Sequence, residues 1–125
     1  MAFQAKNYSI RSDNKFGYST VFDIAREVEA NTEPWFNQTL TQVNESVVRL
    51  GILQGEFHWH KHDLEDELFF VLEGELFIDV ENAATVTLKR HQGYTMPKGV
   101  VHRTRAPQRA VVLMVEPAGV VPTGD

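Results

Sequence analysis

The stretch Asp66–Leu76, which reads DELFFVLEGEL, decides the fold. Its central run, Leu68–Leu72, is apolar at every position, and Glu73-Gly74 separates it from a second strand-like run, Glu75–Val80. This arrangement predicts a β-hairpin that turns at Gly74. Because successive side chains of a strand point to opposite faces, both faces of the first run must be covered. The N-terminal arm and helix can cover the outer face, or a partner subunit can do so, and we favour a homodimer.

Further short β segments lie on both sides of this stretch. From Asn44 to Pro117, turn residues separate strand-sized runs, and no helical period lies between them. This pattern predicts an all-β domain, an antiparallel sandwich or small barrel. The other predicted strands are Ser46–Leu53 (interrupted at Gly51), Glu56–His62, Ala84–Leu88, Val100–Thr104 and Ala110–Val115.

The only persuasive helical pattern is Ser19–Asn31, for which Thr20 is a suitable N-cap. The helix precedes all the predicted strands. We therefore expect residues 1–43 to form an arm and a helix that pack on a barrel of residues 44–117, and residues 118–125 to form a tail.

Composition narrows the class of protein. A chain of 125 residues with 42% hydrophobic and 23% charged residues is typical of one globular domain. No apolar run is long enough to cross a membrane, and the first residues lack the apolar core of a signal peptide, so a cytoplasmic location is expected. The chain has no cysteine, which excludes disulfides and thiolate-bound metals. A net charge of −5 argues against nucleic acid as a partner.

Charge is unevenly distributed along the chain. Eight carboxylates and no Lys or Arg lie between Asp63 and Glu81, whereas six Lys or Arg and no carboxylate lie between Lys89 and Arg109. The two blocks can pair with each other across strands. Alternatively, the second block can form a basic rim that attracts an anionic ligand.

Three of the five histidines alternate in His58-Trp-His-Lys-His62. On a strand all three point to one face, but they span about 13 Å, since the rise is about 3.3 Å per residue. At most one adjacent pair can therefore bind a single ion, and this can be either His58 with His60 or His60 with His62. A further histidine, His102, follows a predicted tight turn at Pro97-x-Gly99.

These motifs resemble the cupin family over roughly Val47 to Pro117. The cupin signature has two halves, and the matching residues are His60-x-His62, four residues, Glu67, six residues and Gly74, followed by Pro97-x-Gly99, two residues and His102. The resemblance implies an antiparallel cupin β-barrel (double-stranded β-helix, jelly-roll type) with one short N-terminal helix. The sequence looks most similar to the small mannose-6-phosphate-isomerase-like cupins.

Three positions depart from the pattern. Gln54 stands where the family has its first glycine, the spacing from Gly93 to Pro97 is short, and Ala106 replaces a frequent asparagine. None of these departures removes a residue that the signature uses as a ligand.

The resemblance implies a metal site. In that family the four matching residues, here His60, His62, Glu67 and His102, bind one divalent metal inside the barrel. Imidazole and carboxylate ligands accommodate Fe, Mn, Ni, Zn, Co or Cu, and leave open coordination positions for Lewis-acid or O2 chemistry.

We therefore expect a metal-dependent isomerase, dioxygenase or lyase that acts on a small polar or anionic molecule. The alternative is a non-catalytic module that binds a metal and a sugar or small acid. Gln54, Phe69 and Thr104 share the parity of a ligand on their own strands, and are candidate walls of the substrate pocket. By the same parity Arg103, next to His102, is expected to face outward.

Overall fold

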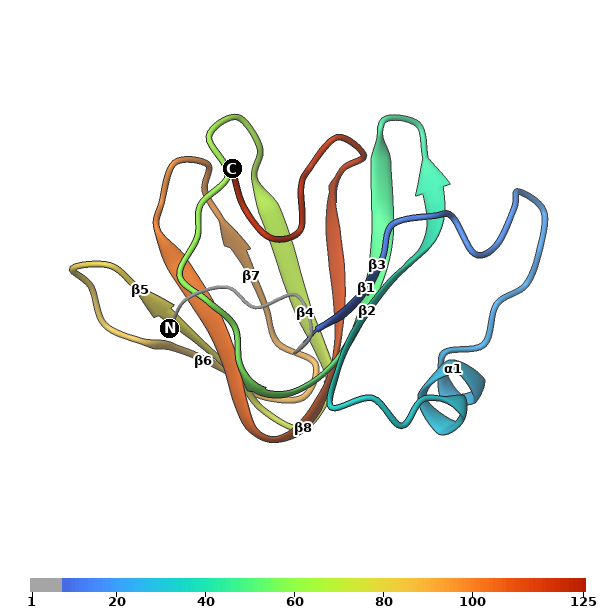
Figure 1. Ribbon diagram of the computed structural model, residues 1–125, viewed down its shortest axis with the longest axis horizontal. Helices are drawn as coiled ribbons and strands as arrows, with labels where there is room; N and C mark the ends of the chain where they lie inside the picture. The colour runs from blue at the N-terminus through green and yellow to red at the C-terminus, as the bar shows by residue number, and fades with distance from the viewer. Residues whose placement is uncertain (1–7) are drawn as a thin grey trace.

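The computed structural model describes residues 8–125 as one curved sheet with a single short helix outside it (Figure 1). This confirms the all-β class with one short N-terminal helix. The described residues contain no helix long and apolar enough to span a membrane. The elements in chain order are β1 (Ser9–Arg11), α1 (Ile24–Ala30), β2 (Trp35–Val43), β3 (Ser46–Glu56), β4 (Glu67–Glu73), β5 (Leu76–Val80), β6 (Val86–Leu88), β7 (Gly93–Met96) and β8 (His102–Pro117).

The sixteen-residue strand β8 organises the sheet. It pairs antiparallel with β3 along most of its length, with β4 near its end and with β5 near its start. The strand order is β1-β2-β3-β8-β4-β7, and β6 joins through β5, so the path does not close into a ring. All pairings are antiparallel except β1 with β2.

The predicted hairpin between the runs on either side of Gly74 is wrong. Strand β4 pairs with β7 and β8, and β5 pairs with β6 and β8, so the two runs follow one another along β8. Gly74 marks the corner between them, with φ of +78°, and a Cβ there would lie 2.8 Å from the carbonyl oxygen of Arg109. This close approach requires glycine at position 74. In the sequence, the same glycine between two strand-like runs looked like part of a two-residue turn.

The helix is shorter than predicted at its start. It begins at Ile24, and the N-cap is Asp23, whose Oδ1 accepts the backbone N–H of Arg26 at 3.3 Å. Thr20 does not cap it, because its hydroxyl donates to the carbonyl of Tyr18 instead. The predicted end at Asn31 is confirmed, since this residue is the C-cap.

Several strand boundaries also differ from those predicted. Strand β3 runs through Gly51 without a break, where a Cβ would lie only 3.1 Å from Cε of Met114. The segment after Glu56 is not a continuous strand, and bonds to β8 through the Phe57 N–H and through an isolated bridge between His60 and His102. The two last predicted strands are one strand, β8. Strand β2 was not predicted, so the sheet begins before residue 44.

Two hydrophobic clusters cover the two faces of the sheet. The inner one includes Phe69 and Val71 of β4 and lies in the concavity where the histidines are found. The outer one includes Leu72, which packs in the same cluster as Ile24 and Val28 of the helix region. The N-terminal helix therefore covers one end of the outer face of β4. Cover by this helix was one of the two predicted alternatives, and cover by a partner subunit was the other.

Candidate metal centre

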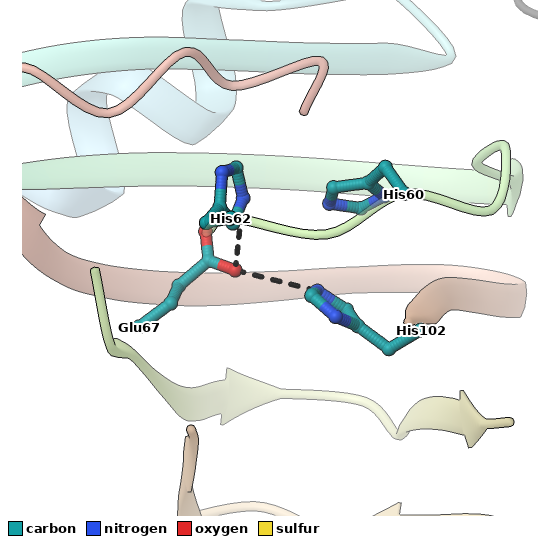
Figure 2. Close-up of side chains that lie close together, drawn as sticks. All are labelled: His60, His62, Glu67 and His102. Carbon is teal, nitrogen blue, oxygen red and sulfur yellow. Dashed lines mark ion pairs between the residues drawn. The ribbon is translucent and has the colours of Figure 1, made fainter. Parts of the chain in front are cut away.

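The structure brings His60, His62, Glu67 and His102 together (Figure 2). One ligand atom from each lies within 4.8 Å of the others. Oε1 of Glu67 lies 3.8 Å from Nε2 of His62 and 3.6 Å from Nε2 of His102. Glu67 is the first residue of β4 and His102 the first of β8, so strand starts place both side chains.

In the segment His58–His62, here called the histidine tract, buried and exposed side chains alternate as expected, although the segment is not a strand. Trp59 is 40% exposed and Lys61 is also exposed, whereas His60 is partly buried and His62 fully buried. The tract is held by paired backbone hydrogen bonds of 2.9 Å between His60 and His102. These bonds fix two of the imidazoles on facing segments, which is why residues 42 positions apart can share one ion.

Two of the histidines have their tautomer set by a backbone carbonyl. Nδ1 of His60 lies 3.0 Å from the carbonyl oxygen of His58, and Nδ1 of His102 lies 2.9 Å from that of Val100. A carbonyl only accepts, so each Nδ1 carries the proton and each Nε2 is left with a lone pair. This is the arrangement in which protein imidazoles bind metals.

Three atoms that face one another in this cluster have no hydrogen-bond partner. They are Nε2 of His62, Oε1 of Glu67 and Nε2 of His102, all completely buried. A buried polar atom without a partner costs about 1–3 kcal/mol, so such atoms seldom gather without a role. A divalent cation bound among them would satisfy all three atoms at once. The residues present therefore fit a metal ion.

Burial also prepares the imidazoles for a cation. It lowers the pKa of His60 to about 3, with the nearby His102 contributing, and lowers the pKa of His62 and His102 as well. All three rings are consequently neutral at physiological pH, as ligands must be. Burial raises the pKa of the Glu67 carboxyl, which the neighbouring Glu116 and Arg49 partly offset.

Sequence reasoning missed a buried pair of an arginine and a glutamate beside this cluster. Nε of Arg49 lies 2.7 Å from Oε1 of Glu116, and both side chains are almost inaccessible. Burial, reinforced by the charge of Glu67, raises the pKa of Glu116 to about 9. The available signal was one charged residue in each of two otherwise apolar strands, Val47–Ile52 and Val111–Glu116.

A small cavity lies beside the cluster. His60 and Glu67 line it together with Trp35, Asn37, Leu53, Phe57, Phe69, Thr104, Met114 and Pro122. It leaves about 30 Å³ for the centres of water-sized molecules. Of the three candidate wall residues, Phe69 and Thr104 line it, whereas Gln54 is exposed and does not.

The charge blocks meet on the opposite side of β8. Asp79 lies 2.9 Å from Nε of Arg103 and 2.8 Å from Nε of Arg105, so both arginines face outward. The pair of arginines holds the pKa of Asp79 well below its ordinary value. Here the two blocks pair across strands, and no Lys or Arg is among the described residues that line the cavity.

Comparisons with known proteins show which family and fold this chain resembles. A family model described as a cupin domain matches residues 47–116. The uncharacterized protein YdbB of Bacillus subtilis is 47% identical over 93 residues, which cover 74% of this chain and 80% of that protein. A crystal structure of a cupin-2 domain containing protein from Shewanella frigidimarina is 30% identical, with a TM-score of 0.73 over 78% of this chain and 94% of its own. The protein SPY1581 from Streptococcus pyogenes shares the fold at 22% identity, with a TM-score of 0.67 over 94% and 100% of the two chains.

Proposed function

This chain belongs to the cupin family, and from that premise we propose that it binds one divalent transition metal through His60, His62, Glu67 and His102. The observation that supports this proposal is the convergence of three buried, unpaired ligand atoms, from His62, Glu67 and His102, on one point. Four ligands leave a first-row metal with one or two open positions, which a water or a substrate oxygen can occupy.

We propose further that the metal serves a small-molecule reaction of the isomerase, dioxygenase or lyase type. A bound cation would act as a Lewis acid on a substrate oxygen. The residues around it orient the substrate: Asn37 and Thr104 offer hydrogen bonds, and Phe57, Phe69 and Met114 exclude water. A polar or anionic group of the substrate would bind at the metal, since none of the described residues that line the cavity is a Lys or Arg. The similarity to mannose-6-phosphate-isomerase-like cupins stays a prediction.

One observation favours the alternative of a non-catalytic binding module. Apart from the proposed ligands, none of the residues that line the cavity within residues 8–125 is an acid or base that titrates near neutral pH. A reaction that needs proton transfer would have to use a ligand, a metal-bound water or the substrate itself. A module that holds a metal and a sugar or small acid needs no such group.

Elemental analysis of the purified protein tests the metal site. We expect close to one divalent transition metal per chain, and loss of most of it in His60→Ala and in His102→Ala. His91→Ala is the matched control, because this histidine is exposed in a turn outside the cluster. Equal metal content in all four proteins would refute the assignment.

Turnover separates the enzyme from the binding module. The metal-loaded protein is screened for O2 consumption and for sugar-phosphate isomerisation, with the metal-free His102→Ala variant as the blank. Metal-dependent turnover supports the enzyme. Saturable ligand binding without turnover supports the module.

We also propose a cytoplasmic homodimer. Leu68 and Phe70, on the outer face of β4, remain partly exposed and belong to neither hydrophobic cluster. A second copy that packs on this face would bury them. Light scattering coupled to size exclusion should give twice the chain mass, and Phe70→Asp should give the mass of one chain.

A further inference from the structure

The C-terminal segment Ala118–Asp125, here called the C-terminal strap, lies against the histidine tract. The carbonyl oxygen of Thr123 lies 2.6 Å from Nε2 of His58. The backbone N–H of Asp125 donates to the carbonyl of Lys61 at 3.0 Å. The strap therefore runs beside the segment that contains His60 and His62, two of the proposed metal ligands.

Gly124 permits this close approach. Its φ is +94°, and a Cβ at this position would lie 2.5 Å from Cβ of His60. Real Cβ atoms do not come so near, so any other residue here would push the strap away from the tract. Position 124 of the strap must therefore be glycine because it lies against His60, a proposed metal ligand.

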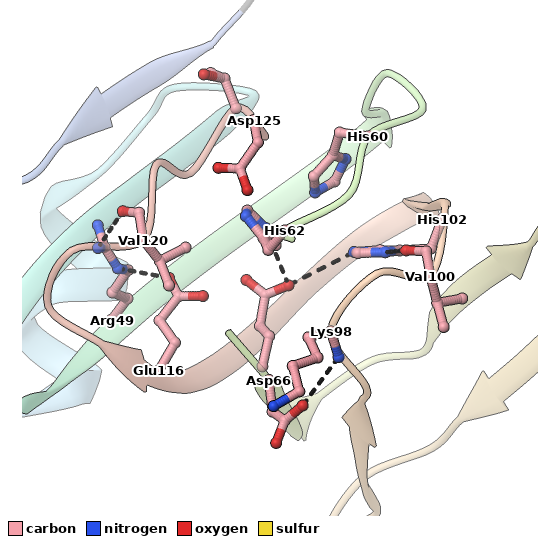
Figure 3. A network of polar contacts seen from close by, with 12 residues as sticks. Arg49, His60, His62, Asp66, Lys98, Val100, His102, Glu116, Val120 and Asp125 are labelled. Carbon is pink, nitrogen blue, oxygen red and sulfur yellow. Dashed lines mark hydrogen bonds and ion pairs between the residues drawn. The ribbon is translucent and has the colours of Figure 1, made fainter. Parts of the chain in front are cut away.

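His62 differs from the other two histidines of the cluster. His60 and His102 each have a backbone carbonyl at Nδ1, but both ring nitrogens of His62 are buried without a hydrogen-bond partner. Carboxylate oxygens of Glu65 and Asp125 lie with a ring nitrogen of His62 in a group whose atoms are all within 4.8 Å of one another. Figure 3 shows Asp125 next to the His62 ring. Two carboxylates thus lie within 4.8 Å of a ring nitrogen of His62.

We propose that Asp125 is the positioning residue of His62: its carboxylate accepts the Nδ1 proton and keeps the Nε2 lone pair directed at the metal. Asp125 is favoured over Glu65 because its carboxylate is already fixed, with Oδ2 accepting the backbone N–H of Asp63 at 2.6 Å. The other carboxylate oxygen remains for the imidazole. Histidine ligands of metals almost always have such a partner. This inference rests on the proposed metal site and adds the strap to it.

The substitution Asp125→Asn tests the proposal with almost no change of shape. If the amide oxygen keeps the bond from the Asp63 N–H, the amide NH2 group turns toward His62. An NH2 group only donates, so it favours the His62 tautomer with the proton on Nε2, which cannot bind a metal. We expect metal affinity to fall about 10- to 100-fold, the usual effect of losing such a partner.

A control variant, Asp63→Asn, and a variant that displaces the strap, Gly124→Ala, isolate the role of the carboxylate. Asp63→Asn removes the same charge next to the strap, but the Asp63 side chain pairs with Lys61 at 2.8 Å and is half exposed. It should bind metal as the wild type does. Gly124→Ala should displace the strap and weaken metal binding to a similar extent as Asp125→Asn. An affinity of Asp125→Asn within twofold of the wild type, or a loss confined to Glu65→Gln, would overturn the proposal.

A second measurement does not depend on metal. The ¹⁵N chemical shifts of the His62 ring report its tautomer in the metal-free protein. We expect the proton on Nδ1 in the wild type and on Nε2 in Asp125→Asn. A wild-type protein that has this tautomer but binds no metal would refute the proposed function alone, whereas the proton on Nε2 in the wild type refutes the role of Asp125.

Discussion

Four consecutive residues of β8, His102 to Arg105, differ in whether their polar side-chain atoms are paired. Arg103 and Arg105 point outward, and each has its Nε within 2.9 Å of the same carboxylate, Asp79. His102 and Thr104 point inward, and Nε2 of His102 is buried 3.6 Å from Glu67 without a hydrogen bond. Since a buried unpaired atom costs stability, the outer face has the pairing that a stable fold needs, whereas the inner face holds atoms that a bound cation would satisfy.

The largest expected difference between the two faces appears when metal is added. A ligand that binds only the folded state at 1,000 times its Kd stabilises the protein by about 4 kcal/mol. We expect a divalent transition metal to raise the melting temperature of the metal-free wild type by well over 5 °C, and to raise that of His102→Ala by almost nothing. Thermal melts with and without metal measure this. Arg103→Ala should keep the full shift, and the comparison fails if it behaves like His102→Ala.

The second expected difference concerns protons released on binding. Three imidazoles with an ordinary pKa of about 6.5 would lose up to three protons to a metal near pH 5.5. Burial lowers the pKa of all three, that of His60 to about 3, so fewer protons remain on them to be released. We expect clearly fewer than three protons per metal near pH 5.5. Titration calorimetry in buffers of different ionisation enthalpy counts them, and a value near three contradicts the expected burial effect.

The ligand set could be predicted from the sequence, but only with the help of a family signature. Strand parity placed the histidines on one face, while the choice of His60 and His62 over His58 came from the cupin spacing. The structure brings the chosen residues together. Parity also predicted correctly that Arg103 faces outward.

What could not be predicted depends on contacts distant in sequence. The hairpin prediction failed because β8, some 30 residues downstream, competes for both runs, and a local turn signal carries no information about it. The Arg49–Glu116 pair joins strands far apart in the chain. The position of Asp125 beside His62 depends on the path of the strap, which shows no periodic pattern.

Glu116 offers a smaller test, on the inner face and without metal. Because burial raises the pKa of Glu116 in the folded state, its contribution to stability is fully present below the ordinary pKa of 4.5 and is lost as pH rises through the raised value. The metal-free wild type should therefore lose stability between pH 6 and 9. Glu116→Gln, which cannot ionise, should be the more stable protein at pH 9, on the order of a few kcal/mol, since one pKa unit is about 1.4 kcal/mol. Urea unfolding at both pH values measures this, and parallel curves for the two proteins would contradict it.

The smallest effect is expected on the outer face. Asp79→Asn removes the carboxylate that holds Arg103 and Arg105, which are 22% and 28% exposed, so solvent screening limits the loss to about 1 kcal/mol. Its pKa is lowered in the folded state, so this contribution is fully present above the ordinary value of 3.8 and is lost only as pH falls from there through the lowered folded-state pKa. The two proteins should therefore differ in urea unfolding at pH 7, and the difference should begin to shrink only below pH 3.8. Metal content and metal affinity should be unchanged in Asp79→Asn. A variant that loses metal would show that the two faces of β8 are coupled, and that pairing on the outer face helps to hold His102 in place.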